Sequence, residues 1–155
     1  MSSFLVNLSK RCLISLRGEQ RDEYLHGQIT VSTKNFAHNK ARFSAHCDFK
    51  GKMWAVFLLT QFEDAFHMMM PVASAQESLT QLKKYGVFSK VTIKDESPDW
   101  HILGGAGEAV KQALTVLFPE LSDEHLSVTS NAFGQVISFN DSSLRYQICL
   151  KAEGY

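Results

Sequence analysis

Apolar and polar positions divide the chain into short segments, most of which are typical of strands. Apolar stretches bounded by glycine or polar turns predict five strands in the first two thirds of the chain: 12–16, 42–48, 53–61, 66–70 and 89–94. The strand at 53–61 is apolar on both of its faces, so we expect it to be central and buried. Between the second and third strands, Asp48 to Gly51 predict a turn in which Gly51 takes a positive φ.

Helical spacing appears twice before residue 90. Residues 19–25 predict a short helix with acidic residues in its first turn. Ser74 and Glu77 form an S-x-x-E capping box, which predicts that a longer helix begins there and ends at Gly86. From residue 40 onward the element order is therefore βββαβ, an antiparallel sheet with a helix on one face.

The last third of the chain, after a boundary at Pro98, also combines strands with one helix. A strand is predicted at 101–104, and a helix at 108–118 whose inward residues are Val110, Leu114, Leu117 and Phe118. Polar turns then separate three further strands, at 127–129, 135–139 and 145–150. The fold class is α+β, with antiparallel sheets and helices on one face of each.

Composition narrows the class of protein. Hydrophobic residues make up 45% of the 155 residues and charged residues 21%, as in ordinary globular proteins. The 16 basic and 16 acidic residues cancel, which argues against direct general nucleic-acid binding. Three scattered cysteines without a C-x-x-C pair fit a reducing compartment, and the longest apolar run, 53–59, is too short to cross a membrane. We therefore expect a cytoplasmic protein.

Three local patterns have a functional and a structural interpretation. The glycines in 104–107 lie where a dinucleotide-binding loop would lie, but the full G-x-G-x-x-G spacing is absent, so a plain strand-to-helix turn is favoured. His46 and Cys47 are adjacent on a strand and point to opposite faces, which favours a hydrogen-bonded His and a buried Cys over a metal site. Met68 to Met70 are expected to fill the core.

Six lysines cluster in the middle of the chain. They are Lys50, Lys52, Lys83, Lys84, Lys90 and Lys94. Such a group is either a solvated surface or a dock for an anion, such as a phosphate or a glutamate tail.

Three blocks of the sequence resemble one known family, in the order that the family has them. Gly18 with 24–30 resembles the opening G-x(5)-[YF]-[LM]-x-G-Q-x-T; residues 45–54 resemble A-H-C-D-x-K-G-K-M-W; and residues 82–93 resemble L-K-K-Y-x-V-F-S-K-V-T-I. The chain is identified on these blocks as similar to the amino-terminal portion of the YgfZ family. Those proteins bind folate, are linked to tRNA modification and iron–sulfur cluster maintenance, and share the fold of the glycine-cleavage T-protein, an aminomethyltransferase.

The resemblance implies an architecture and a function. The family fold is a ring of three lobes with folate in the central hole, of which this chain would form an incomplete part. Residues 1–39 and 98–155 would belong to a discontinuous first lobe, and 40–97 to an inserted second lobe. The implied function is folate binding in support of tRNA modification and iron–sulfur enzymes. Tetrahydrofolate or a derivative is the implied ligand, bound weakly by this chain alone because walls from the other lobes are absent.

The same resemblance implies folate-contacting residues. They are Arg11, at a position where close relatives carry a Trp, together with Gln28, Thr30, Tyr85 and Lys90 from the matching blocks. We expect the last four side chains to face the centre of the ring, near the pterin or its glutamate tail. No catalytic residue and no metal ligand is expected.

Two departures from the family pattern bear on catalysis. The signature K-G-C-x-x-G-Q-E is absent from this chain. Aminomethyltransferases also place a catalytic aspartate shortly after the glycine that matches Gly51, where this chain has 53–56 and no carboxylate to handle a proton on folate. A non-catalytic role is therefore favoured. A folate-dependent aminomethyltransferase and a stand-alone protein-interaction module remain alternatives.

The carboxy-terminal strands suggest association with another chain. Their apolar residues need a cover, and only five residues follow the strand 145–150. If the helix at 108–118 does not cover the whole sheet, the exposed face would bind a second copy or another partner. The resemblance to the YgfZ family separately implies tRNA-modifying or iron–sulfur enzymes as partners. A homodimer or a partner-dependent protein is the expectation.

Overall fold

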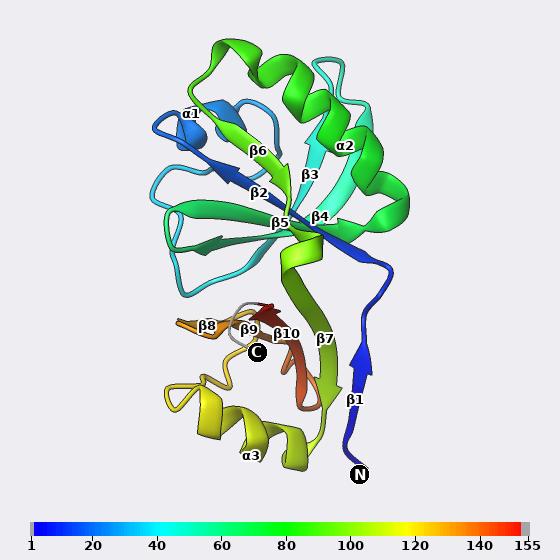
Figure 1. Ribbon diagram of the computed structural model, residues 1–155, viewed down its shortest axis with the longest axis vertical. Helices are drawn as coiled ribbons and strands as arrows, with labels where there is room; N and C mark the ends of the chain where they lie inside the picture. Colours follow the sequence, from blue (N-terminus) through cyan, green and yellow to red (C-terminus); the bar gives the residue numbers. More distant parts are fainter. Residues whose placement is uncertain (1, 153–155) are drawn as a thin grey trace. The chain divides into compact units, whose positions relative to one another are not determined.

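The computed structural model describes residues 2–152, and the chain forms two compact units (Figure 1). Unit 1 contains residues 1–9, 39–41 and 99–155, and unit 2 contains residues 10–38 and 42–98. Each unit is built on one five-stranded sheet in which every strand pairing is antiparallel. The predicted α+β class with antiparallel sheets is confirmed.

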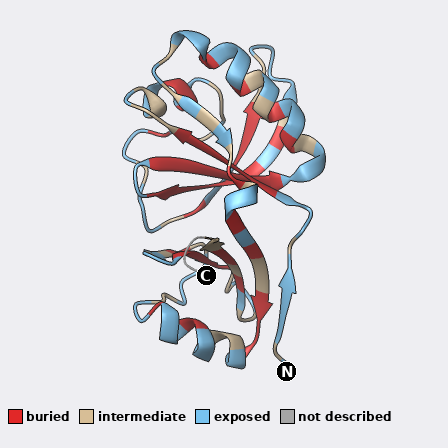
Figure 2. Ribbon diagram, in the orientation of Figure 1, coloured by how far each residue is buried: buried red, intermediate tan, exposed pale blue. Residues whose placement is uncertain are grey.

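Unit 2 has two helices on one face of its sheet (Figure 1). Its elements are β2 (Arg11–Arg17), α1 (Arg21–His26), β3 (Arg42–Cys47), β4 (Met53–Phe62), β5 (Ala65–Pro71), α2 (Val72–Tyr85), a 3-10 turn (Gly86–Phe88) and β6 (Thr92–Asp95). The strand order is β3-β4-β5-β2-β6. Alternate residues of the central strands pack against Leu25 of α1 and Leu82 of α2, both fully buried. The central strands are almost entirely buried (Figure 2).

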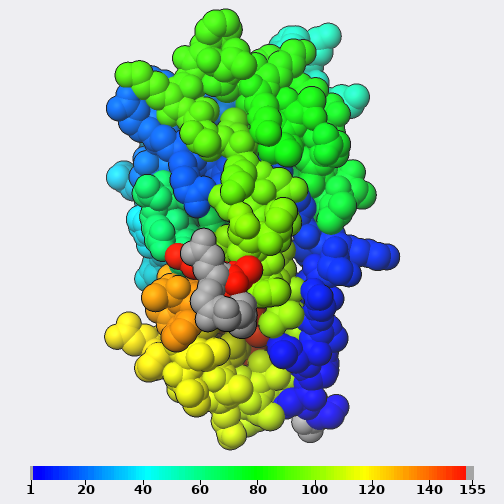
Figure 3. Space-filling model, viewed as in Figure 1, coloured from blue at the N-terminus to red at the C-terminus, as the bar shows by residue number. Residues whose placement is uncertain are grey.

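Unit 1 has one α-helix on its sheet. Its elements are β1 (Phe4–Asn7), β7 (Trp100–Ala106), α3 (Glu108–Leu117), β8 (Val128–Asn131), β9 (Gly134–Ser138) and β10 (Arg145–Lys151), in the strand order β1-β7-β10-β9-β8. Leu114 and Phe118, at the end of α3, pack on Val136, Tyr146 and Ile148 of the sheet. β1 is an edge strand whose four residues are all exposed, and it is visible as a blue rim of this unit in Figure 3.

The division into units differs from the one predicted, 1–39 with 98–155 against 40–97. Most of the difference lies in residues 10–38, which belong with 42–98; residues 40, 41 and 98 also fall in the other unit from the one predicted. β2 runs between β5 and β6 and pairs with both, so it is a central strand of that sheet. The partners of β2 lie some fifty to eighty residues away in the chain, so the local pattern of residues 40–97 predicts a complete βββαβ unit without it.

Local details of the prediction also change. The capping box is wrong: α2 begins at Val72, two residues before Ser74, and the Ser74 hydroxyl donates to the carbonyl of Pro71 at 3.2 Å. Pro71 has an extended conformation and precedes the first helical residue, so it sets the start instead. The edge strand β1 was not predicted. Leu117 was expected to face inward but is 39% exposed.

Other expectations are confirmed. The φ of Gly51 is +82° in the turn between β3 and β4. β7 runs through Ala106, and Gly107 precedes the first residue of α3, so the glycines in 104–107 form a strand and its turn into a helix. The side chains of Met68 to Met70 are all buried. Among residues 2–152, no helix combines the length and apolar character needed to cross a membrane.

Candidate functional site

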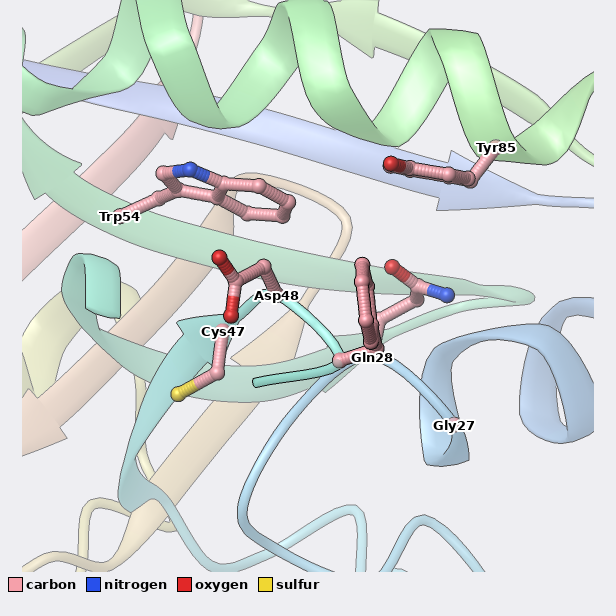
Figure 4. Close-up of a pocket in the computed structure, with 7 residues that line it drawn as sticks. Gly27, Gln28, Cys47, Asp48, Trp54 and Tyr85 are labelled. Carbon is pink, nitrogen blue, oxygen red and sulfur yellow. The ribbon is translucent and has the colours of Figure 1, made fainter. Parts of the chain in front are cut away.

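Unit 2 carries an open hollow beside the end of α2 (Figure 4). The space within it is about 390 Å³, a volume that includes open solvent at its mouth. Its lining comes from four places in the chain: the loop after α1, the end of β3 with the following turn, β4, and the end of α2. The lining residues are Gly27, Gln28, Cys47, Asp48, Phe49, Trp54 and Tyr85.

The backbone around the hollow is held by hydrogen bonds that the sequence makes possible. The amide of Cys47 donates to the carbonyl of Gln28 at 3.2 Å, which ties the loop after α1 to the end of β3. One carboxylate oxygen of Asp48 accepts the amides of Lys50 and Lys52, both at 2.8 Å, and so closes the tight turn at Gly51. A register shift between His46 and Cys47 lies at the same point. Such irregularities re-aim side chains at the end of a strand.

Two aromatic rings form one side of the hollow. The ring centres of Trp54 and Tyr85 are 6.5 Å apart and their planes differ by 21°. Figure 4 shows the two rings side by side under α2, with Gln28, Cys47 and Asp48 on the other side. Tyr85 is 44% exposed, so its ring is open to a ligand. A flat aromatic surface of this kind binds planar ring systems by stacking.

Polar groups face this aromatic pair. Gln28 and Asp48 are half-buried, and within residues 2–152 the side-chain amide of Gln28 makes no hydrogen bond. The second carboxylate oxygen of Asp48 is likewise without a hydrogen bond in the described part of the chain, because the turn uses only the first. The hollow therefore offers one NH₂ donor group and two acceptor oxygens opposite a stacking surface.

Two cations lie close to the aromatic lining. The Lys50 ammonium is 5.7 Å from the centre of the Phe49 ring, and the Lys84 ammonium is 5.4 Å from the centre of the Tyr85 ring. Neither lysine has an acidic partner among residues 2–152. By contrast, Lys90 pairs with Glu19 at 2.7 Å and Lys94 lies 3.8 Å from Glu96. Of the six clustered lysines, Lys50 and Lys84 are thus the ones beside rings of the hollow.

His46 lies behind the aromatic surface. Its side chain is fully buried, and its Nδ1 lies 2.7 Å from the hydroxyl of Ser78 on α2. Its ring packs edge-on against Trp54, with centres 4.8 Å apart and planes at 69°. Burial lowers the pKa of His46 to about 4, so the ring is neutral at neutral pH. The expected hydrogen-bonded His is confirmed, whereas Cys47, expected to be buried, is half-exposed in the hollow.

The structure brings two of the five predicted folate contacts together, Gln28 and Tyr85. Thr30 is instead part of the backbone framework: its hydroxyl accepts the amide of Ala45 at 3.0 Å. Arg11 lies exposed at the start of β2, opposite Pro71 of β5, and does not line the hollow. Lys90 also lies outside the lining.

Sequence reasoning did not select the other five lining residues. Four of them, Cys47, Asp48, Phe49 and Trp54, belong to the block 45–54 that carried the resemblance, so the signal was present in the sequence. Residues 53–56, which follow Gly51, contain no carboxylate. Asp48, three residues before Gly51, nevertheless places a carboxylate at the hollow. In the part of the chain that the structure describes, no cluster of three or more His, Cys, Asp or Glu could hold a metal ion.

A pterin ring fits the chemistry of this lining. The ring is planar, and its amide-like edge carries N–H donors and a carbonyl acceptor. Trp54 and Tyr85 supply the stacking surface, Asp48 an acceptor and Gln28 both a donor and an acceptor. An anionic tail attached to such a ring would find Lys50 or Lys84 nearby.

Two solved structures share the fold of this chain. The chain superposes on the glycine-cleavage aminomethyltransferase T of Bartonella henselae with a TM-score of 0.79, at 16% identity, covering 96% of this chain and 42% of that one. It also matches the heterotetrameric sarcosine oxidase of Corynebacterium sp. U-96, with a TM-score of 0.64 at 13% identity, covering 97% of this chain and 76% of that one. The two units thus have an aminomethyltransferase-like fold.

Sequence comparison then shows which proteins the chain is related to. The chain is 35% identical to the tRNA-modifying protein YgfZ of Photorhabdus laumondii over 92% of its length, and 36% identical to that of Colwellia psychrerythraea over 93%. The YgfZ protein of Escherichia coli matches at 33% over 93%. These alignments cover 42 to 44% of the relatives, so the chain spans well under half of their length. The chain is a homologue of the YgfZ proteins over that segment. No family model matches it.

Proposed function

We propose that unit 2 of this chain provides a folate-binding surface, with the pterin ring stacked on Trp54 and Tyr85. The observation that carries the proposal is the aromatic pair facing polar groups across one hollow. Stacking on an aromatic side chain is worth about 1–3 kcal/mol for a nucleobase, and a pterin is a ring system of similar kind.

The polar side of the hollow gives the orientation. The free carboxylate oxygen of Asp48 accepts hydrogen bonds from N–H groups on the edge of the pterin, while the Gln28 amide pairs with the neighbouring carbonyl or ring nitrogen. The glutamate tail then extends towards the ammonium groups of Lys50 and Lys84, which have no acidic partner in residues 2–152.

The wider role follows from the relatives. Their name describes tRNA modification, and we propose that this chain serves the same process by presenting folate, and thereby supports iron–sulfur enzymes. The chain itself is proposed to be non-catalytic. It spans well under half of the relatives' length, and the hollow is open, so we expect this chain alone to hold folate weakly.

Titration calorimetry with (6S)-5-formyltetrahydrofolate tests the proposal. Trp54→Leu and Tyr85→Leu each remove one stacking ring and should weaken binding about tenfold. Phe88→Leu is the matched control: Phe88 is an aromatic residue three positions after Tyr85, 97% exposed and outside the hollow. If both wall substitutions bind as tightly as the Phe88 control, the proposal is wrong.

The tail can be tested separately with 6-hydroxymethylpterin, which has the ring but no glutamate. Lys50→Gln with Lys84→Gln should weaken binding of the formyl folate and leave binding of the hydroxymethylpterin unchanged. Equal losses for the two ligands would contradict the assignment of the tail to these cations.

The position of Asp48 in the hollow favours a second candidate function, that of a folate-dependent aminomethyltransferase. A carboxylate at the hollow is a group that can hold or move a proton. Turnover of an aminomethyl donor in the presence of tetrahydrofolate, abolished in Asp48→Asn even at folate concentrations that saturate the variant, would establish this candidate over a non-catalytic role.

A further inference from the structure

The buried histidine behind the hollow has an incomplete set of hydrogen bonds. His46 is 0% exposed, and its Nδ1 has a partner in Ser78, but its Nε2 is buried without a hydrogen-bond partner. An unpaired buried nitrogen costs free energy, so its environment has to compensate in another way. The group that packs against the imidazole ring is the indole of Trp54, in an edge-to-face arrangement.

The protonation of the ring follows from these neighbours. Burial lowers the pKa of His46 to about 4, so the neutral ring carries one N–H. If the Ser78 hydroxyl donates to Nδ1, the proton is on Nε2, where it can be directed at the electron-rich face of an aromatic ring. The opposite tautomer would leave a buried lone pair with no donor. The first arrangement leaves no buried lone pair without a donor, and the aromatic ring that packs against the imidazole is that of Trp54.

The same helix holds both ends of this contact series. Ser78 and Tyr85 are seven residues apart on α2 and therefore lie on one face of it. Ser78 contacts His46, His46 contacts Trp54, and Trp54 stacks with Tyr85. Trp54, in β4, is thus fixed to α2 twice, once through the histidine and once through the tyrosine.

We propose that His46 is a positioning residue for the ligand site: held by Ser78, it fixes the plane of the Trp54 ring on which a planar ligand stacks. His46 is not itself among the lining residues. Its effect on affinity rests on the proposed folate-binding function, whereas its effect on Trp54 does not depend on any ligand.

Ser78→Ala is the main test, because it removes one hydroxyl and leaves both rings in place. Trp54 and Trp100 are the two tryptophans of the chain, so a Trp100→Phe background makes Trp54 the single reporter. We expect Ser78→Ala to move the indole N–H signal of Trp54 in NMR spectra and to raise its quenching by acrylamide about twofold, since a less fixed ring is more accessible. Ser78→Thr keeps the hydroxyl and should restore the original signal.

Thr80→Ala is the control. Thr80 is also on α2, and its hydroxyl bonds only within the helix, to the carbonyl of Gln76 at 2.8 Å. Unchanged Trp54 signals and quenching in Ser78→Ala, equal to those of Thr80→Ala, would overturn the proposal. His46→Phe, which keeps a ring but no N–H, should act like Ser78→Ala. If that variant fails to fold, Ser78→Ala still decides.

The affinity for (6S)-5-formyltetrahydrofolate completes the test. In Ser78→Ala it should fall about fivefold, the size of one aromatic contact, with Thr80→Ala unchanged. A disturbed Trp54 with unchanged affinity would overturn the role of His46 in binding. No binding by the unsubstituted chain would count against the proposed function alone, and the Trp54 signals would still show whether His46 positions the ring.

Discussion

The guanidinium of Arg17 lies 2.6 Å from the carboxylate of Glu96, across 79 residues of sequence. The side chain of Glu96 is 7% exposed, and the Ser15 hydroxyl donates to the same oxygen at 2.8 Å. The pair joins the central strand β2 to the end of β6, and it therefore holds residues 10–38 to the rest of unit 2.

Glu96→Gln should destabilise unit 2 by about 1–3 kcal/mol, because it weakens hydrogen bonds between charged groups in a buried setting. Burial alone would raise the pKa of Glu96, but the hydrogen bonds from Arg17 and Ser15 outweigh it and lower that pKa. The contribution is therefore present above the pKa of an unfolded glutamate and is lost as the pH falls through the lower folded value.

Urea unfolding followed by Trp54 fluorescence in the Trp100→Phe background measures this loss. Glu19→Gln is the control, since Glu19 and Lys90 form an exposed pair of the kind that contributes less than about 1 kcal/mol. Equal losses for the two substitutions would show that the half-buried Arg17–Glu96 pair contributes no more to stability than the exposed pair.

His46 predicts a second, separate pH dependence. Its folded pKa of about 4 lies below the usual value near 6.5, so the unfolded chain binds more protons between these limits. Stability should therefore rise with pH from about 4 to 6.5, by about 3 kcal/mol in total, and change little from this source above 6.5. His46→Phe should flatten that rise, and the exposed His38, substituted in the same way, is the control. An equally steep rise in His46→Phe would contradict the assignment.

Alanine substitutions at two glycines distinguish the cost of backbone strain from the cost of a steric clash. Gly18 and Gly51 both have positive φ, +118° and +82°. A Cβ at Gly51 would meet nothing within 4 Å, whereas at Gly18 it would collide with the carbonyl oxygen of Lys90. Gly51→Ala should cost about 1 kcal/mol and Gly18→Ala clearly more, measured by urea unfolding. Equal costs would mean that the backbone near Lys90 yields easily.

How far the sequence determined this picture depends on the range of the contacts. Gly51 and the apolar run of β4 act locally, so the turn and the buried strand follow from their neighbours in the chain. Pro71 also acts locally, but the S-x-x-E pattern at Ser74 predicted a later helix start than the observed one. The position of β2 does not, because its partners in β5 and β6 are some fifty to eighty residues away. The edge strand β1 was not predicted because Phe4 to Asn7 do not alternate between apolar and polar residues, and all four are exposed.

The candidate site also depends on contacts between residues far apart in the sequence, which local patterns do not predict. Gln28 and Tyr85 were selected from matching blocks and do meet at one hollow, but so do Asp48 and Trp54, which were not selected. Nothing in the spacing shows that a residue in β4 stacks with one at the end of α2. Thr30 and Lys90 belong to the same blocks and serve other contacts, with Ala45 and Glu19.

We predict that the chain self-associates, and the edge strand β1 is one surface at which a second copy can bind. Phe4, Leu5 and Val6 are 56%, 58% and 44% exposed, and the strand pairs with β7 on one side. It carries no lysine or proline, the residues that usually protect an edge. Sedimentation velocity should show a dimer, and Leu5→Lys should shift it towards monomer. A monomer at all concentrations without the substitution would rule the prediction out.

The central claim is that a folate stacks on Trp54 and Tyr85, and ¹⁵N–¹H NMR of the Trp100→Phe chain tests it most directly. The single indole N–H signal then belongs to Trp54. On titration with (6S)-5-formyltetrahydrofolate we predict that this signal shifts progressively and saturably, together with the backbone amides of Gln28 and Tyr85. Signals that stay fixed up to millimolar ligand, or shifts confined to unit 1, would contradict the account.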